Sequence, residues 1–100
     1  MALRITLQAN AAEMVIKLEG RLAGPWTAEL DRLWSESKPT LNTRKLVLDL
    51  RDTTFADAAG IRALRAIYSQ TQAEILTGTP WTQYLAGEVT RENLQPLDAE

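Results

Sequence analysis

The sequence predicts an α/β domain: a four-stranded mixed, mainly parallel sheet with three helices packed on it. Strand and helix patterns follow one another in the order β-β-α-β-α-β-α. The run from Leu46 to Leu50 is apolar except for Asp49, which is typical of a strand buried on both faces of a parallel sheet. Because strands joined through a helix run parallel by right-handed crossovers, only the first strand is expected to be antiparallel.

Residues 4–8 and 13–19 are predicted to form the first two strands. Both segments carry apolar residues in short strand-like runs, and the segment 9–12 between them is short enough for a hairpin loop. A hairpin makes the two strands antiparallel neighbours.

A first helix is predicted to begin at Pro25, because proline suits the first helical position, where no N–H group is required. Its apolar face has helical spacing and comprises Trp26, Leu30, Leu33 and Trp34. The helix is expected to end near residues 37–39, and the next residues lead into the central strand.

The stretch from Lys45 to Tyr68 is the centre of the prediction. Its strand is expected to end at Leu50, because residues 51–54 are polar, and Phe55 then provides one large apolar anchor. Asp57 can cap the following helix by accepting hydrogen bonds from the free N–H groups of the first turn. The buried stripe of that helix comprises Ile61, Leu64, Ile67 and Tyr68.

A short last strand is predicted over residues 74–77, followed by a short helix that Gly87 is expected to end. The apolar residues of this helix are Trp81, Tyr84 and Leu85. Residues 88–100 are mostly polar, and we expect at most partial order there. The sequence therefore predicts one domain over residues 1–90 and a polar C-terminal tail over residues 91–100.

The composition argues against several classes of function. The chain has 100 residues and a net charge of −2, with 11 basic and 13 acidic residues interspersed, so there is no basic field for nucleic acid. It has no histidine and no cysteine, and hence lacks the commonest general base and the commonest metal ligands. We expect no cofactor, no membrane insertion and no signal peptide, and predict a cytoplasmic protein.

The central stretch resembles the core motif of the STAS domain, which is found in bacterial anti-sigma factor antagonists and at the cytoplasmic end of sulfate transporters. The matching residues are Leu48, Asp49, Leu50, Phe55, Asp57, Gly60, Ile61 and Leu64. The segment 18–22 is also similar to the exit of a STAS strand, and the resemblance extends over roughly residues 3–88. It implies the STAS fold and a protein-binding module that acts by partner switching in the regulation of transcription, not an enzyme.

One departure from the family motif bears on regulation. In switchable STAS members, a serine or threonine between the aspartate and the glycine is phosphorylated by a cognate kinase. The corresponding positions here are Ala58 and Ala59, which have no hydroxyl to accept a phosphoryl group. Thr53 and Thr54 are the only hydroxyl-bearing residues of the central loop, but their spacing does not fit the motif.

The resemblance implies that the partner is an anti-sigma factor or a related serine-kinase-type regulator. The predicted contact surface is the central loop and the exposed face of the next helix, comprising Thr53, Thr54, Asp57, Ala58, Ala59, Arg62, Arg65 and Ser69. Each of these residues also has an ordinary structural interpretation. Asp57 can be a simple helix cap, and Arg62 and Arg65 can lie on a solvated helix face.

Two alternatives remain open at this point. Residues 57–60 differ by one hydroxyl from the Asp-Thr-Ala-Gly motif of STAS subunits that dock on the ATPase of bacterial phospholipid ABC transporters. A small-ligand-binding α/β domain is the other alternative, with a pocket formed by Asp49, Asp52 and an exposed Trp81.

Overall fold

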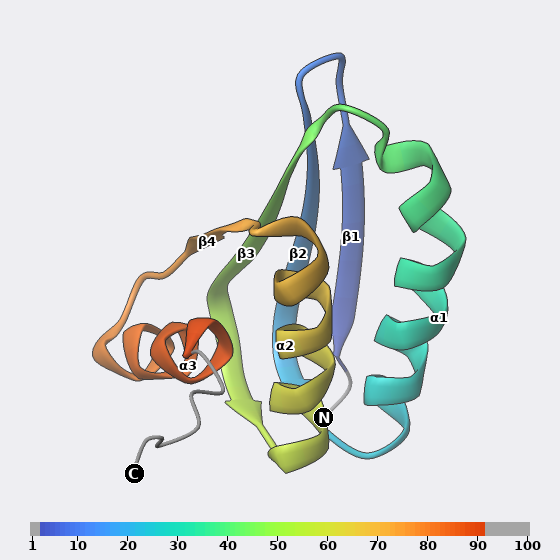
Figure 1. The fold of residues 1–100 in the computed structure, drawn as a ribbon. Coiled ribbons are helices and arrows are strands. Elements are labelled where there is room, and N and C mark those ends of the chain that lie inside the picture. The colour runs from blue at the N-terminus through green and yellow to red at the C-terminus, as the bar shows by residue number, and fades with distance from the viewer. Residues whose placement is uncertain (1–2, 92–100) are drawn as a thin grey trace, which may run out of the picture.

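The computed structural model describes residues 3–91 and forms one sheet with three helices (Figure 1). The elements are β1 (Arg4–Ala9), β2 (Glu13–Leu22), α1 (Pro25–Leu41), β3 (Lys45–Ala56), α2 (Ala58–Thr71), β4 (Glu74–Leu76) and α3 (Pro80–Thr90). The strand order in the sheet is β1-β2-β3-β4; β1 pairs antiparallel with β2, and the other neighbours are parallel. This architecture confirms the predicted fold class.

One face of the sheet and the three helices share the hydrophobic core. Alternate residues of β2 and β3 point to this face, namely Met14, Ile16, Leu18, Leu46, Leu48 and Leu50. The helices cover them with Leu30, Trp34, Leu64, Ile67, Leu85 and Val89. In Figure 1, α2 lies between α1 and α3, and it contacts both.

The opposite face of the sheet carries charged side chains that pair across strands. Lys45 Nζ lies 2.7 Å from Glu74 Oε1, which joins β3 to β4, and Lys17 Nζ lies 3.6 Å from Asp52 Oδ2, which joins β2 to β3. Val47 is buried between these pairs. The strand Leu46–Leu50 is therefore buried on both faces, as its apolar run predicts.

The prediction that β3 ends at Leu50 is wrong, since the strand continues to Ala56. The polar second half of β3 remains a strand because β2 is also longer than expected and pairs with β3 as far as Leu22. The register shifts twice along this pair, and each shift places one extra residue in β3, as in a β-bulge. A polar residue can then turn inward: Thr53 Oγ1 donates to the carbonyl oxygen of Leu18 at 2.9 Å.

Two helix ends also differ from the sequence prediction. α1 continues through Pro39 to Leu41, because a proline in the last turn removes only one hydrogen bond of a helix that is about to end. α3 continues through Gly87 to Thr90, because Val89 is buried in the core and anchors the last turn. Residues 88–90, expected to be partly ordered at most, are therefore helical, and residues 92–100 of the predicted tail lie outside the described residues.

Candidate functional site

The junction between β3 and α2 is organised by Asp57. Its backbone is extended, and its Oδ1 accepts a hydrogen bond from the backbone N–H of Gly60 at 2.8 Å, which confirms the predicted helix cap. The other carboxylate oxygen accepts from the N–H of Gly24 at 3.3 Å, and Gly24 is the residue that precedes α1. One carboxylate thus joins the starts of two helices.

Gly60 lets the start of α2 lie directly on the end of β2. A Cβ atom built at this position would lie 2.6 Å from the carbonyl oxygen of Leu22 and 2.9 Å from its Cγ. Such distances are shorter than real Cβ contacts, so the glycine is required by close approach and not by an unusual backbone angle.

Ala58 and Ala59 are the first two residues of α2. Ala58 is exposed and Ala59 is half-buried, so the helix begins with a small apolar surface that carries no hydroxyl at either position. Beside them, Phe55 is 36% exposed and the guanidinium of Arg21 lies 4.2 Å from the centre of its ring. Phe55, predicted as one large apolar anchor, is therefore partly exposed at this surface.

The two threonines of the predicted contact surface point in different directions. Thr53 is 3% exposed and its hydroxyl is used within the sheet, whereas Thr54 is exposed. The Thr53 side chain is therefore inside the domain and is not available at the surface.

The exposed face of α2 presents Arg62 and Ser69 to solvent and uses Arg65 for packing. Arg65 Nε donates to the carbonyl oxygen of Glu88 at 2.7 Å, and its Nη2 lies 3.4 Å from Glu88 Oε1. Arg65 therefore ties α2 to the last turn of α3. The Ser69 hydroxyl donates to the carbonyl oxygen of Ala66 one turn earlier at 3.0 Å.

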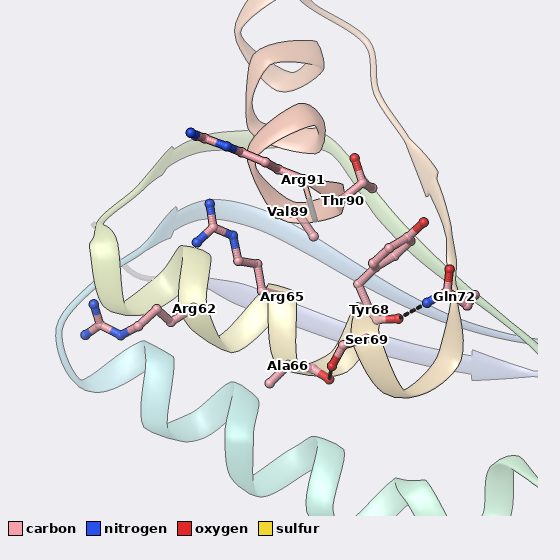
Figure 2. Close-up of a pocket in the computed structure, with 9 residues that line it drawn as sticks. All are labelled: Arg62, Arg65, Ala66, Tyr68, Ser69, Gln72, Val89, Thr90 and Arg91. Carbon is pink, nitrogen blue, oxygen red and sulfur yellow. Dashed lines mark hydrogen bonds between the residues drawn. The ribbon is translucent and has the colours of Figure 1, made fainter. Parts of the chain in front are cut away.

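A hollow of about 530 Å³ lies between the C-terminal half of α2 and the end of α3 (Figure 2). Its lining from α2 and the residue after that helix comprises Arg62, Arg65, Ala66, Tyr68, Ser69 and Gln72. The end of α3 contributes Val89, Thr90 and Arg91. We call this hollow the arginine groove.

Sequence reasoning found only one side of the arginine groove. It placed Arg62, Arg65 and Ser69 on one helix face from their spacing. It missed Arg91 and Glu88, because a helix expected to end at Gly87 gives no reason to place residues 88–91 beside α2. Val89 was the available signal, because an apolar residue four positions after Leu85 continues the apolar face of the helix, and it is buried in the structure.

The alternative ligand pocket finds little support among the described residues. Asp49 is 4% exposed, and its carboxylate accepts two hydrogen bonds from the Arg51 guanidinium, from Nε at 3.0 Å and from Nη2 at 2.9 Å. These bonds, with that from the Arg51 N–H, hold the pKa of Asp49 below its usual value although burial opposes this. Asp52 faces Lys17, and no group of metal-ligating side chains gathers within residues 3–91.

Trp81, which the sequence suggests as an exposed aromatic anchor, is half-buried and packs against the hydrophobic core. The exposed aromatic residue of α3 is Tyr84, at 62% exposure. None of the helices between residues 3 and 91 has the length and apolar character that a membrane span requires.

Similarity to known proteins is found at the level of structure. No protein-family model matches the chain, and no curated protein matches it in sequence. The anti-sigma factor antagonist SpoIIAA in its unphosphorylated form matches with a TM-score of 0.65 at 13% identity, over 84% of this chain and 80% of that one. An antisigma-factor antagonist STAS domain from Rhodobacter sphaeroides matches with a TM-score of 0.54 at 16% identity, over 89% and 92% of the two chains.

The chain has the STAS fold. A third structure, an uncharacterized protein with a SpoIIAA-like fold from Shewanella loihica PV-4, agrees, with a TM-score of 0.57 at 12% identity over 89% of this chain and 80% of that one. The resemblance seen in the central stretch is thus confirmed for the fold. At such low identity the role of this STAS fold has to be argued from its own residues.

Proposed function

We propose that this chain is a non-catalytic protein-binding module of the anti-sigma factor antagonist kind, which contacts its partner through the start and exposed face of α2. The partner is an anti-sigma factor or a related serine-kinase-type regulator, and the module acts in the bacterial cytoplasm, in the regulation of transcription. Phosphorylation between Asp57 and Gly60 does not control the binding.

The observation that carries this proposal is the alanine pair at the start of α2. Ala58 is exposed, so a partner surface can reach it, and neither Ala58 nor Ala59 offers a hydroxyl. The neighbouring Asp57 is engaged with two backbone N–H groups, which fixes the position of this helix start. A fixed, uncharged helix start suits a contact that is permanently in its unphosphorylated form.

The chemistry of the other candidates supports binding over catalysis. The chain has no histidine or cysteine, and Asp49 and Asp52 are each paired with a basic side chain. General acid–base work needs a group that is free to exchange protons near neutral pH, and a carboxylate held ionised by a bidentate arginine is unsuited to it.

Docking on the ATPase of a phospholipid ABC transporter is the second candidate. It is favoured by the single-hydroxyl difference between residues 57–60 and the Asp-Thr-Ala-Gly motif. It uses the same surface and differs only in the partner, so both partners have to be assayed in parallel.

We expect no phosphate on residues 53–59 when the protein is incubated with ATP and a serine-kinase-type regulator from the same genome. Intact mass followed by peptide mapping is the measurement. Ala58→Ser restores a hydroxyl at the exposed position and serves as the matched control, which we expect to gain one phosphate. A phosphate on Thr54 of the unaltered chain would contradict the absence of a switch.

Ala58→Glu is expected to weaken partner binding at least about tenfold, because it adds a charge and bulk at the centre of the proposed contact. An acidic residue in the first turn is compatible with the helix dipole, so the fold should be retained. Titration calorimetry with the regulator and with the ATPase measures the effect.

Gln83→Glu is the matched control for this substitution. It adds the same charge at an exposed position in the first turn of α3, away from the start of α2. Equal affinities for the Ala58→Glu and Gln83→Glu proteins would remove the start of α2 from the interface. Binding to the ATPase alone would assign the second candidate.

A further inference from the structure

The arginine groove differs in charge from the rest of the chain. Arg62 and Arg65 lie on successive turns of α2, and Arg91 extends from the end of α3 toward the same hollow (Figure 2). No acidic side chain lines the hollow within residues 3–91. Three of the 11 basic residues thus gather at one place in a chain whose net charge is −2.

Glu88 balances only part of this positive charge. Its carboxylate accepts from Arg65 Nη2 at 3.4 Å and from Arg91 Nη1 at 3.2 Å, so one carboxylate is shared by two guanidinium groups. Arg62 forms no ion pair with any described carboxylate. Because each guanidinium has five N–H donors, most donors of the groove remain available to an acceptor from outside.

The arrangement of these arginines favours an extended ligand over a single small anion. Arg65 and Arg91 already share the Glu88 carboxylate, and Arg62 lies one turn before Arg65 on α2, so the three guanidinium groups do not converge on one free anion, as tight phosphate binding requires.

The floor of the groove is apolar. Ala66 and the ring of Tyr68 line the groove from α2, and the buried Val89 lines it from α3 (Figure 2). A ligand that fits must therefore bring aliphatic side chains as well as negative charges, which is the character of an acidic protein segment.

We propose that the arginine groove binds an acidic segment, with interspersed aliphatic side chains, of the partner protein that contacts α2. This inference rests on the proposed function, and it adds a second point of contact next to the start of α2. The guanidinium groups of Arg62 and Arg91 bind the carboxylates of the segment, and its aliphatic side chains cover the exposed Ala66 and the ring of Tyr68.

The test uses the full chain and a fluorescein-labelled peptide of alternating Glu and Leu residues, followed by fluorescence anisotropy. A matched peptide with Gln in place of each Glu should bind at least about tenfold more weakly, because it loses the charge-assisted hydrogen bonds. Binding of the acidic peptide should also fall with added salt. No binding of the acidic peptide, or equal binding of both peptides, overturns the proposal.

The double variant Arg62→Glu with Arg91→Glu should weaken binding of the acidic peptide at least about tenfold. The control with the same change in charge is Arg4→Glu with Lys38→Glu, two exposed residues outside the groove, and it should leave the affinity unchanged. Since a glutamate at position 91 lies near Glu88, the milder Arg62→Gln tests the groove without that repulsion. Unchanged affinity in both groove variants overturns the proposal.

The competing occupant is the end of the chain itself, which carries Glu92, Asp98 and Glu100. A protein that stops at Arg91 should bind the peptide as the full chain does. Tighter binding after truncation would assign the groove to residues 92–100 and overturn the assignment to a partner. If the peptide binds while Ala58→Glu leaves partner binding intact, the contact at the start of α2 fails and the groove stands. If the peptide does not bind while Ala58→Glu weakens partner binding, the groove fails and the proposed function stands.

Discussion

Asp49 and Asp57 are both carboxylates at or beside β3, and each is held by a different kind of donor. Asp57 accepts from the backbone N–H groups of Gly60 and Gly24, whereas Asp49 accepts from the Arg51 guanidinium and from the Arg51 N–H. A buried carboxylate without such donors would be strongly unfavourable, so hydrogen bonding explains why β3 can contain an acid at a buried position.

The pKa of Asp49 leads to a prediction about acid stability. Because hydrogen bonds from Arg51 lower this pKa in the folded chain, ionised Asp49 stabilises the fold at pH values above its ordinary pKa of about 3.9. That stabilisation is lost as the pH falls through the lowered pKa of the folded state. We expect Asp49→Asn to flatten the dependence of the free energy of unfolding on pH below about pH 5, measured by urea denaturation.

Arg51→Met provides the complementary measurement. It leaves the Asp49 carboxylate buried without its bidentate partner, so the pKa of Asp49 should rise and the protein should lose stability at neutral pH. Unfolding curves of both variants that follow the unaltered chain at every pH would show that the pair does not contribute.

At the scale of elements, two helical glycines have opposite surroundings. An added Cβ at Gly60 would collide with the backbone of Leu22, whereas an added Cβ at Gly87 would meet nothing within 4 Å. The first glycine is thus needed for α2 to pack on β2, and the second only adds backbone freedom to α3.

Substituting alanine at each glycine should shift stability in opposite directions. We expect Gly60→Ala to destabilise the fold by about 1–3 kcal/mol, because backbone and helix must move apart. We expect Gly87→Ala to stabilise it by about 0.5–1 kcal/mol through higher helix propensity. Urea denaturation measures both, and a Gly60→Ala protein as stable as the unaltered chain would contradict the packing of α2 described above.

The helices and strands differ in how far the sequence predicts them. The cap at Asp57 follows from local chemistry and is confirmed. Of the predicted buried stripe of α2, Leu64 and Ile67 are buried, whereas Ile61 and Tyr68 are partly buried and pack against the core. The second half of β3 could not be predicted, because its residues are polar and only pairing with the extended β2 makes them a strand. Local propensity is overridden there by a contact that is distant in sequence.

At the scale of the whole molecule, the order of elements and the STAS-like central stretch were sufficient to predict the fold. The placement of Arg62, Arg65 and Ser69 together on α2 was predictable, because one helix carries all three residues. The arginine groove was not, because it requires that the end of α3 lie against α2 through Arg65 and Glu88. Such a contact between helices has no local signature in the sequence.

The exposed alanine at the start of α2 has an evolutionary consequence. Alanine and serine codons are separated by a single nucleotide change, and the Ala58 side chain is exposed, so a hydroxyl can be gained there without repacking. If the proposed contact surface holds, a lineage carrying this domain can pass between permanently active and kinase-controlled forms by one point mutation. Selection can then change whether a kinase controls the domain, while the architecture of the domain stays constant.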